Sequence, residues 1–510
     1  MPRPNRENSI PPAPLTKAPY GAKLPLPGSV HLTMSPQNLE LNGGNVLMGG
    51  SPLRLLRLSD RGKALVAKWT AGAAVGETRI EQLLARRLVS AGVCFPQPTT
   101  SGYEASDVTV VIPVRDRPAQ LQRLLASLKG LACVVVDDAS ADPSETAAIA
   151  KSVEARFIAL PENLGPAGAR NAGLMMADTP LVAFVDSDCE PNDDWLLPLL
   201  GHFDDPLVAV VAPRIVPAHV ESPTALVRYE AVRSSLDRGS APGLVRPLSA
   251  IPYIPSAAMV VRRSVAGTAL FDEALRGGED VDLVWRMVEA GWEVRYVPDS
   301  VVAHSGPTST REWLARRTFY GTTAGPLARR HPDNLWPLQT SAWSAATWAL
   351  LWFRRPILAA GTLGYSVITL GQRLNGLVDD PFAVALKIAG GGTTKSALPA
   401  LSGLTRAWSP ALLLGLIFRR SRWAAGLALL LPAVNDYLSN PGELDPVRYT
   451  ALHVTDDVAY GVGVWRGCLQ ARSLRPLIPR IHIRSRVWSS SSLRQQLKAS
   501  ETTTRRDGSA

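Results

Sequence analysis

Two aspartates separated by one residue, Asp186 and Asp188, directly follow the apolar run 181–185. A short apolar run of this kind predicts a buried strand. Carboxylates at the open end of a strand are the hard oxygen ligands that Mg²⁺ or Mn²⁺ prefers. A cation held there could neutralise the diphosphate of a leaving nucleotide. The same pair occurs in solvated turns, so the preceding strand is the feature that favours a metal site.

Two further carboxylate pairs stand next to predicted elements. Asp137 and Asp138 close an apolar run, where Asp138 could accept a hydrogen bond from a base or a ribose. Glu279 and Asp280 precede the helical run 283–290, where a carboxylate could act as the general base that an attacking hydroxyl requires. Either pair could instead cap a turn or a helix.

Segment 163–173 is rich in glycine and contains one arginine, Arg170. Glycines that open a helix let the backbone approach a ligand closely, and a helix amino terminus attracts anions. The segment therefore indicates an anion-binding loop, although a loop that only needs positive φ angles has the same composition. A lone histidine, His304, follows the apolar run 297–303 and by itself is more typical of a structural residue.

The elements that must position these residues alternate between strands and helices. Runs 108–113, 133–138 and 157–160 predict buried strands, and segments 118–128 and 144–155 predict the helices between them. This alternation predicts an α/β protein with a doubly wound sheet. In such sheets the ligand lies beyond the carboxyl ends of the strands, where the residues above are placed.

Read in order along residues 107–320, these segments resemble the family 2 glycosyltransferases of the GT-A fold. The resemblance is carried by Ile112-Pro113-Val114-Arg115-Asp116, Val135-Val136-Asp137-Asp138-Ala139-Ser140, Asn163-Leu164-Gly165 with Ala169-Arg170-Asn171, Phe184-Val185-Asp186-Ser187-Asp188, and Glu279-Asp280. It implies an inverting, metal-dependent hexosyltransferase with a Rossmann-like, doubly wound mixed sheet.

The resemblance also implies roles for individual residues. Asp280 becomes the catalytic base, and His304 joins Asp186 and Asp188 as a ligand of Mg²⁺ or Mn²⁺. The residues expected to bind the nucleotide sugar are Pro113, Arg115, Asp116, Asp138, Asn163, Gly165, Arg170 and Asp186. For the acceptor, the sequence offers three tryptophan rings that could stack on a sugar or another flat ring: Trp195, Trp285 and Trp292.

The rest of the chain divides by composition. The expected parts are a flexible lead (1–25), a small strand-and-helix module (26–100), the transferase domain (107–330), a helical membrane-associated region (331–470) and a basic, disordered tail (471–510). A winged-helix arrangement is one option for the module, and its role could be peptide capture or packing on the next domain. The amino terminus lacks the basic-then-apolar layout of a secretory signal.

Charge and hydropathy favour the cytoplasmic face of a membrane. The formal net charge of +10 favours anionic partners, which could be nucleotide phosphates, an acidic membrane surface or nucleic acid. Charge alone does not choose among them, and the resemblance implies a nucleotide sugar and a membrane face with no nucleic acid. Arginines cut each of the apolar stretches 343–370 and 411–434 into pieces shorter than the roughly 20 residues of a spanning helix. We therefore expect helices that lie in the membrane interface, with buried core helices as the alternative. The arginines are Arg354, Arg355, Arg419, Arg420 and Arg422.

The leading module contains Gly49-Gly50-Ser51-Pro52-Leu53-Arg54-Leu55-Leu56-Arg57-Leu58-Ser59 and is followed by the transferase domain and an apolar tail broken by arginines. This layout resembles the glycosyltransferases of mycofactocin systems. That resemblance implies a β-linked glucose chain, built from UDP-glucose on a peptide-derived redox cofactor. The Gln-x-x-Arg-Trp motif of processive synthases is absent from the sequence, and Arg311–Arg317 is only a loose substitute, so we expect a short oligosaccharide. The alternatives are a membrane glycosyltransferase with a lipid or cell-envelope polysaccharide acceptor, a nucleotidyltransferase, which would not need Asp280, and a non-catalytic peptide-binding membrane adaptor.

Overall fold

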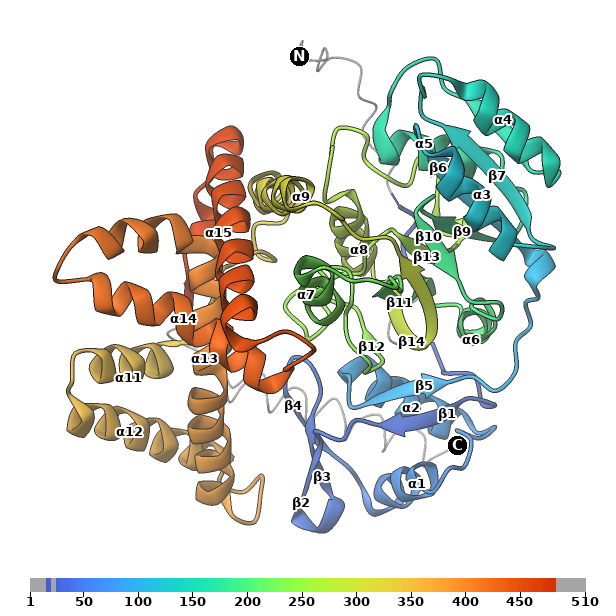
Figure 1. The fold of residues 1–510 in the computed structure, drawn as a ribbon. Helices are drawn as coiled ribbons and strands as arrows, with labels where there is room; N and C mark the ends of the chain where they lie inside the picture. The colour runs from blue at the N-terminus through green and yellow to red at the C-terminus, as the bar shows by residue number, and fades with distance from the viewer. Residues whose placement is uncertain (1–14, 20–23, 483–510) are drawn as a thin grey trace. The chain divides into compact units, whose positions relative to one another are not determined.

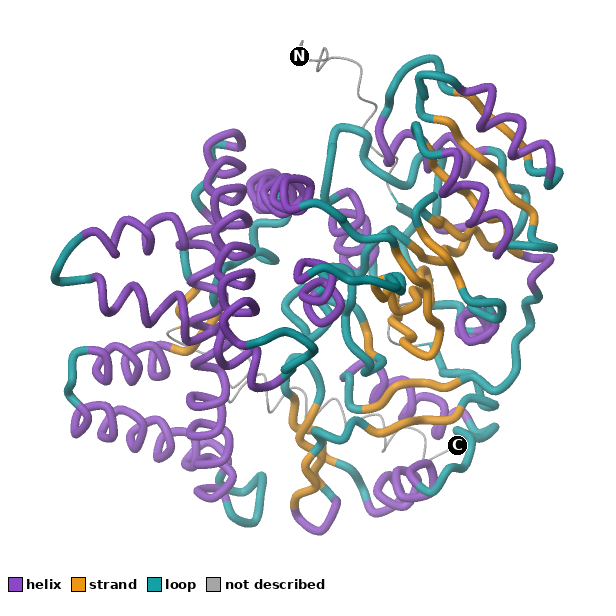
Figure 2. The backbone as a smooth tube through the Cα atoms, viewed as in Figure 1, coloured by secondary structure: helices purple, strands orange, loops and turns teal. Residues whose placement is uncertain are grey.

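The computed structural model describes residues 15–19 and 24–482, which form two compact units. The sheet unit contains the described residues up to Met34 together with Trp69–Trp313. The helical unit contains Ser35–Lys68 together with the described residues from Leu314 onward. Figure 1 shows the elements in chain order, and Figure 2 shows which of them are helix and which are strand.

The sheet unit alternates strands and helices over most of its length. Its elements are β1 (His31–Met34), α2 (Arg79–Ala91), β5 (Cys94–Gln97), η3 (Ala105–Asp107), β6 (Val108–Val114), α3 (Pro118–Ser127), β7 (Ala132–Asp137), α4 (Pro143–Ser152), β8 (Arg156–Ala159), α5 (Gly165–Met175), β9 (Leu181–Val185), β10 (Cys189–Pro191), α6 (Leu197–Leu200), η4 (Gly201–Asp204), β11 (Val208–Pro217), α7 (Ala225–Arg233), β12 (Gly243–Leu244), β13 (Ala258–Arg262), η5 (Arg263–Val265), α8 (Glu279–Glu289) and β14 (Glu293–His304).

One mixed sheet forms the centre of this unit. Its strand order is β10-β14-β11-β13-β9-β6-β7-β8, and β12 pairs with β14. Strands β8, β7, β6 and β9 are parallel neighbours, whereas β13 is antiparallel to β9. Valine-rich β6, β7 and β9 are buried over nearly their whole length, as expected for strands covered on both faces. The predicted doubly wound mixed sheet is therefore confirmed.

The amino-terminal residues that the structure describes are attached to the sheet unit. Trp292 donates from Nε1 to the Thr16 carbonyl oxygen at 2.6 Å, and the Ala18 N–H donates to the Ala290 carbonyl at 3.1 Å. This part of the predicted lead thus has defined contacts. Residues 1–14 and 20–23 of the lead and residues 483–510 of the predicted tail lie outside the described residues.

The predicted module 26–100 is divided between the two units, because residues 35–68 fold with the helical unit. On the sheet unit, β1 pairs antiparallel with β5. Helix α2 begins with a capping box, in which Thr78 Oγ1 accepts from the Glu81 N–H and Glu81 accepts from the Thr78 N–H. The winged-helix arrangement stays a prediction.

A buried ion network holds α2 against the sheet. Asp205 contacts two guanidinium groups, that of Arg295 and that of Arg86, the latter at 2.6 Å. Glu293 is 3.3 Å from Arg86 and 2.8 Å from Arg295, and all four side chains are buried. Burial alone would raise the pKa of Asp205, but the charges of Arg295 and Arg86 outweigh it and hold that pKa below its usual range. The network is therefore ionised and couples α2 to β14.

Replacing Asp205 with alanine should lower the free energy of unfolding by about 3–5 kcal/mol, because two buried guanidinium groups lose their shared partner. The pKa of Asp205 is depressed in the folded state. The stabilisation from Asp205 is therefore complete above the pKa that this carboxyl has in the unfolded chain. It is lost as the pH falls through the pKa of Asp205 in the folded protein. Urea unfolding at neutral pH measures the loss. The matched control is Asp178→Ala, because the exposed ion pair of Asp178 with Arg156 should contribute little to stability. A loss of less than about 1 kcal/mol in the free energy of unfolding for Asp205→Ala would contradict the prediction.

The helical unit is mostly α-helix. Its elements are β2 (Leu39–Leu41), η2 (Asn42–Gly44), β3 (Val46–Gly49), β4 (Arg54–Arg57), α1 (Asp60–Thr70), α9 (Thr310–Thr322), α10 (Ala324–Arg330), β15 (Gln339–Ser341), α11 (Ala342–Trp352), α12 (Pro356–Leu374), α13 (Pro381–Ile417), α14 (Arg422–Ser439), α15 (Pro446–Ala471), η6 (Arg475–Leu477) and β16 (Arg480–His482). Helices α1 and α9 cross the boundary between the units by a few residues.

A small sheet from the amino-terminal part of the chain packs on these helices. Strands β2, β3 and β4 form an antiparallel meander, in which Val46 and Met48 share a buried cluster with Leu374. Beside it, the Asn42 side chain donates to the Leu377 carbonyl at 3.3 Å, a contact between residues 335 positions apart. This pairing is not visible in the sequence, because it joins two segments that each read as separate local patterns.

Helix α13 has 37 residues and contains Pro399 and Pro410. Among the described residues it is the one helix long and apolar enough to cross a membrane, judged by length and composition, and 22% of its most apolar window is buried. This helix was not predicted from the sequence, because the apolar stretches 343–370 and 411–434 include only its last residues. One such helix is weak evidence for a membrane span, since core helices of soluble proteins meet the same criteria.

Candidate active site

The sheet topology gathers the predicted site residues at one edge. The carboxyl ends of β6, β7 and β9 meet there because these strands are parallel neighbours. Strand β13 runs the other way, so the residues before it reach the same edge: the Asp186 N–H donates to the Ala257 carbonyl at 2.9 Å. Pairing of β10 with β14 places His304 opposite Cys189, next to Asp188.

Arg170 joins the end of β9 to helix α8. Its guanidinium donates to Asp186 Oδ1 at 2.6 Å and to Glu279 Oε1 at 3.0 Å, and it lies 5.3 Å from the centre of the Phe271 ring. The Arg170 side chain is 2% exposed, whereas that of Asp186 is 30% exposed. Arg170 is thus a buried bridge between two carboxylates, and its predicted contact with the nucleotide sugar stays a prediction.

Asp188 lies between a histidine and an arginine. His304 Nε2 is 3.4 Å from Asp188 Oδ1, and Arg117 Nη1 contacts Oδ2. Burial alone would raise the pKa of Asp188, but hydrogen bonding and charge from His304 and Arg117 hold that pKa well below its usual range. Asp188 is therefore an ionised carboxylate near neutral pH. Arg117 was not among the predicted site residues, and its only signal in the sequence is its place two residues after Arg115.

Asp280 is held at the first turn of α8. Its carboxylate accepts from the Val281 N–H at 2.8 Å and from the Ser256 N–H at 3.3 Å. Burial and the negative charge of Glu279 raise the pKa of Asp280 to about 7, although Arg170 acts in the opposite direction. A carboxyl group with this pKa is well matched to accepting a proton near neutral pH.

Arg115 and Asp116 follow β6 at the exposed rim of the site, where each side chain is 51% exposed. Asp116 has a positive φ of 53°, which is stabilised because its N–H donates to Ser140 Oγ at 2.8 Å and its Oδ1 accepts from the Ala141 N–H at 2.7 Å. Pro113 is the one half-buried residue of β6. All three predicted nucleotide-binding residues are therefore open to a ligand from the strand end.

Asp138 and the glycine-rich loop before α5 are less exposed than Arg115 and Asp116. The Asp138 carboxylate accepts from the Leu164 N–H at 2.7 Å and the Gly165 N–H at 3.0 Å, and its side chain is largely buried. Asn163 Oδ1 is 3.4 Å from Arg276, and Gly165 has a φ of 79°, a conformation that L residues rarely adopt. In this structure Asp138 fixes the glycine-rich loop, and contact of these three predicted residues with the nucleotide stays a prediction.

Two residues that hold the site together were not predicted to do so. Asn171 Oδ1 accepts from the Leu270 and Phe271 N–H groups, each at 3.0 Å, and so fixes the segment that leads to α8. Ser256, just before β13, donates its N–H to Asp280. Asn171 lies in the segment that carries the family resemblance, which could have indicated it, but nothing in the sequence distinguishes Ser256.

The three tryptophans expected to offer stacking surfaces are buried. Trp195, Trp285 and Trp292 are 2%, 3% and 8% exposed. Their rings pack inside the sheet unit, and the Trp285 Nε1 donates to the Pro252 carbonyl at 2.9 Å. The expectation that these rings stack on an acceptor is therefore wrong. A large aromatic ring can pack in a core as well as stack on a ligand, and burial decides between the two.

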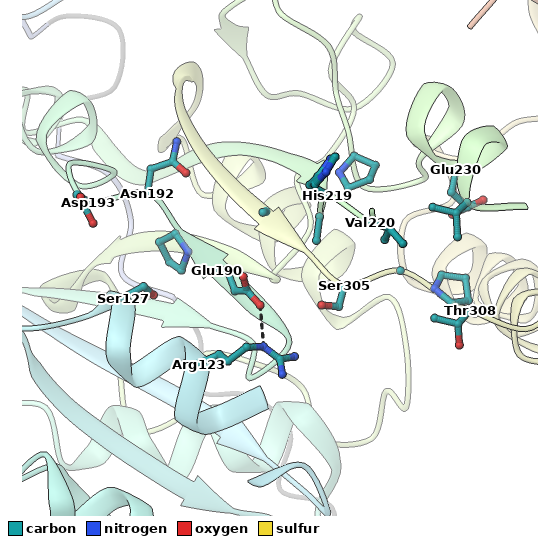
Figure 3. A pocket seen from close by; sticks show the side chains of 17 residues that line it. Arg123, Ser127, Glu190, Asn192, Asp193, His219, Val220, Glu230, Ser305 and Thr308 are labelled. Carbon is teal, nitrogen blue, oxygen red and sulfur yellow. Dashed lines mark hydrogen bonds and ion pairs between the residues drawn. The ribbon is translucent and has the colours of Figure 1, made fainter. Parts of the chain in front are cut away.

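A cavity of about 920 Å³ flanks the pairing of β10 with β14, and its lining includes both sequence neighbours of His304, Ala303 and Ser305. Glu190 of β10 also contributes to its wall. Figure 3 shows the Arg123–Glu190 ion pair at one side and Val220 at another. The wall is completed by Ser127, Pro191, Asn192, Asp193, Pro217, Ala218, His219, Val227, Glu230, Gly306, Pro307 and Thr308. Its volume is in the range of small-molecule sites.

The chemistry of the donor set fits a divalent cation. Ligand atoms that share one ion at about 2.1 Å each lie roughly 3 Å apart, close to the 3.4 Å between Asp188 Oδ1 and His304 Nε2. Within the described residues, no three histidine, cysteine, aspartate or glutamate side chains are already grouped as an ion site. Asp186, whose Oδ1 faces Arg170, would have to join the pair.

Comparison with known proteins gives a consistent picture. Residues 109–267 match the family model described as "Glycosyl transferase family 2". The chain is 41% identical over 454 residues to the Pre-mycofactocin glycosyltransferase of Mycobacterium tuberculosis. The aligned region covers 86% of this chain and 95% of that protein. It is also 27% identical over 275 residues to an N-acetylglucosaminyltransferase of Rhizobium meliloti. That aligned region covers 49% of this chain and 64% of the Rhizobium protein.

Among solved structures, the chain is similar to a mannosyltransferase from Pyrobaculum calidifontis in complex with GDP-Man and Mn²⁺. The TM-score is 0.35 at 19% identity, covering 68% of this chain and 91% of that chain. A structure of GalNAc-T7 with UDP, GalNAc and Mn²⁺ has a TM-score of 0.31 at 15% identity, covering 44% of this chain and 52% of that chain.

Proposed function

Because this chain belongs to the family 2 glycosyltransferases, we propose that it transfers glucose from UDP-glucose to a peptide-derived redox cofactor of the mycofactocin type. The linkage formed is β, and the product is a short oligosaccharide. The acceptor class is supported by the 41% identity to the Pre-mycofactocin glycosyltransferase, which extends over 86% of the chain. An inverting glycosyltransferase of this kind releases UDP.

The donor binds across the strand ends. Arg115 and Asp116 at the exposed rim contact the uridine, together with Pro113 and the loop that Asp138 fixes. Asp186, Asp188 and His304 would hold Mg²⁺ or Mn²⁺, and that ion would supply positive charge next to the leaving diphosphate. Arg117, which contacts Asp188, adds positive charge next to the diphosphate. This role is supported by its 42% exposed side chain.

Asp280 acts as the general base. Its carboxylate takes the proton of the acceptor hydroxyl as that oxygen bonds to the sugar C1, and the bond from C1 to the phosphate oxygen breaks on the opposite side, which releases UDP. The backbone N–H groups of Ser256 and Val281 fix the carboxylate. The single observation that carries the proposal is the Arg170 bridge, since it joins the end of the Asp-x-Asp strand to the helix that begins with Glu279 and Asp280.

The protein works at the cytoplasmic side of the cell membrane. Support comes from the composition of the helical unit, where α11–α14 leave many large apolar side chains exposed. The long apolar helix α13 adds weak support.

Incubation with UDP-[¹⁴C]glucose and Mn²⁺ tests the transferase activity. We expect label in a peptide-derived acceptor, with UDP as the by-product. Pyrophosphate as the by-product would indicate a nucleotidyltransferase, and absence of both products under all acceptor and metal conditions would indicate a non-catalytic adaptor. Label in extracted lipid or polysaccharide alone would overturn the proposed acceptor class.

We place the acceptor in the cavity that flanks the pairing of β10 with β14, so filling that cavity should weaken acceptor binding. Val220→Trp adds a ring at a cavity-lining residue that is 42% exposed, and the KM for the acceptor should rise at least tenfold. Slow hydrolysis of UDP-glucose should continue unchanged, because the donor site is not altered. Val153→Trp, at an exposed residue after α4, is the matched control. An unchanged acceptor KM in Val220→Trp would place the acceptor elsewhere.

A further inference from the structure

We propose that two helix–helix turns of the helical unit form a docking surface for an anionic lipid bilayer. The first turn, residues 352–358, joins α11 to α12, and the second, residues 417–423, joins α13 to α14. Both turns project to the left of the view in Figure 1, and the four helices that carry them pack on one another in sequence. The inference rests on the proposed location at the membrane and names the residues that make the contact, whereas the transferase activity does not depend on it.

Both turns expose large apolar side chains. In the first turn Phe353 and Ile357 are 72% and 85% exposed, and in the second Ile417 and Trp423 are each 75% exposed. Scattered surface apolar residues are ordinary, but clusters of them at a tip mark a contact with a partner or a membrane. The aromatic rings are of the kind that settle at the level of lipid headgroups.

Arginines stand directly beside these apolar residues. Every one of the five turn arginines is exposed: Arg354, Arg355, Arg419, Arg420 and Arg422. Between residues 342 and 435 the only acidic residues are Asp379 and Asp380, which join α12 to α13 and thus lie at the helix ends away from the turns. The turns therefore present positive charge with apolar side chains, a combination that suits anionic headgroups above an acyl layer.

The same charges argue against a second copy of this chain as the partner. In a symmetric dimer the two turns would meet their own copies, and arginine would face arginine. Helix α11, with 11 residues, spans about 16 Å, about half of the roughly 30 Å of the hydrocarbon core, and exposed arginines stand in both turns. The turns therefore enter the interface from one side, with the arginines at the headgroups.

Vesicle flotation of the full-length protein tests this surface. We expect binding to vesicles of phosphatidylcholine with phosphatidylglycerol, and much weaker binding to phosphatidylcholine alone. Arg354→Gln with Arg355→Gln should lower the partition constant by about thirtyfold, since each arginine at an anionic surface contributes about fivefold. Phe353→Ser with Trp423→Ser should lower it at both lipid compositions. The charge-matched control is Arg156→Gln with Arg448→Gln, which removes two exposed arginines away from the turns.

The outcomes separate the docking surface from the enzyme. UDP-glucose hydrolysis in solution should be the same in wild type and turn variants, which also shows that the variants fold. Equal flotation of turn and control variants, or a concentration-dependent dimer in light scattering that the turn variants abolish, would overturn the proposal. If the wild-type protein showed no UDP-glucose hydrolysis, that result would count against the proposed transferase activity and would leave the flotation result valid.

Discussion

Asp188→Ala should lower the rate of sugar transfer at least a thousandfold. The substitution removes a carboxylate that is ionised and only 3.4 Å from His304, at the end of a strand where a cation and a diphosphate would meet. A thousandfold loss corresponds to about 4 kcal/mol of transition-state stabilisation, within what one metal ligand at a developing charge can supply. The Asp188 side chain is 12% exposed at the end of a strand and is not part of the apolar core, so the fold should persist.

Single-turnover transfer from UDP-[¹⁴C]glucose measures the effect, and circular dichroism checks the fold. Binding of Mn²⁺, followed by electron paramagnetic resonance with UDP present, should weaken in parallel with the rate. Asp178→Ala is the control: it removes an aspartate that is 81% exposed on the same unit and should leave transfer unchanged. A rate for Asp188→Ala within tenfold of wild type would remove Asp188 from the metal site.

The central sheet was predictable from sequence because its strands carry their own signal. Runs such as 108–113 and 133–138 are β-branched and continuous, so each indicates a strand covered on both faces without help from distant residues. The carboxylates at their ends follow from topology, since parallel neighbours end at one edge. Asp138 and Asp186 are therefore expected at the same edge of the sheet, and the parallel pairing of β6 with β7 and β9 confirms this.

Other parts depend on pairings between distant segments. Arg170 looked like an anion ligand because its charge and its glycine neighbours are visible in the sequence, whereas its burial between Asp186 and Glu279 is not. The segment 35–68 resembled part of an amino-terminal module, but its apolar face is completed by α12 and α13. Local patterns show which face of an element is apolar, and they do not show which distant element covers it.

Asp280→Asn should lower kcat by roughly 10²–10⁴ while leaving the affinity for UDP-glucose nearly unchanged. Asparagine keeps the size of the side chain and can still accept from the Ser256 and Val281 N–H groups, but it cannot take up a proton at the reaction pH. Titration with UDP-glucose and single-turnover transfer separate binding from chemistry. Asp272→Asn is the matched control, a buried aspartate ahead of α8. Equal loss of donor affinity in Asp280→Asn would give Asp280 a binding role instead.

The pH dependence of the wild-type enzyme gives an independent measure of the same role. A general base works only when deprotonated, and burial with the charge of Glu279 raises the pKa of Asp280 to about 7. Transfer should therefore be at its plateau above pH 8 and fall about tenfold per pH unit well below pH 7. Glu279→Gln removes the neighbouring negative charge, so the midpoint should move to lower pH. A wild-type profile that is flat from pH 5.5 to 8.5, or a midpoint that moves upward in Glu279→Gln, would show that another group accepts the proton.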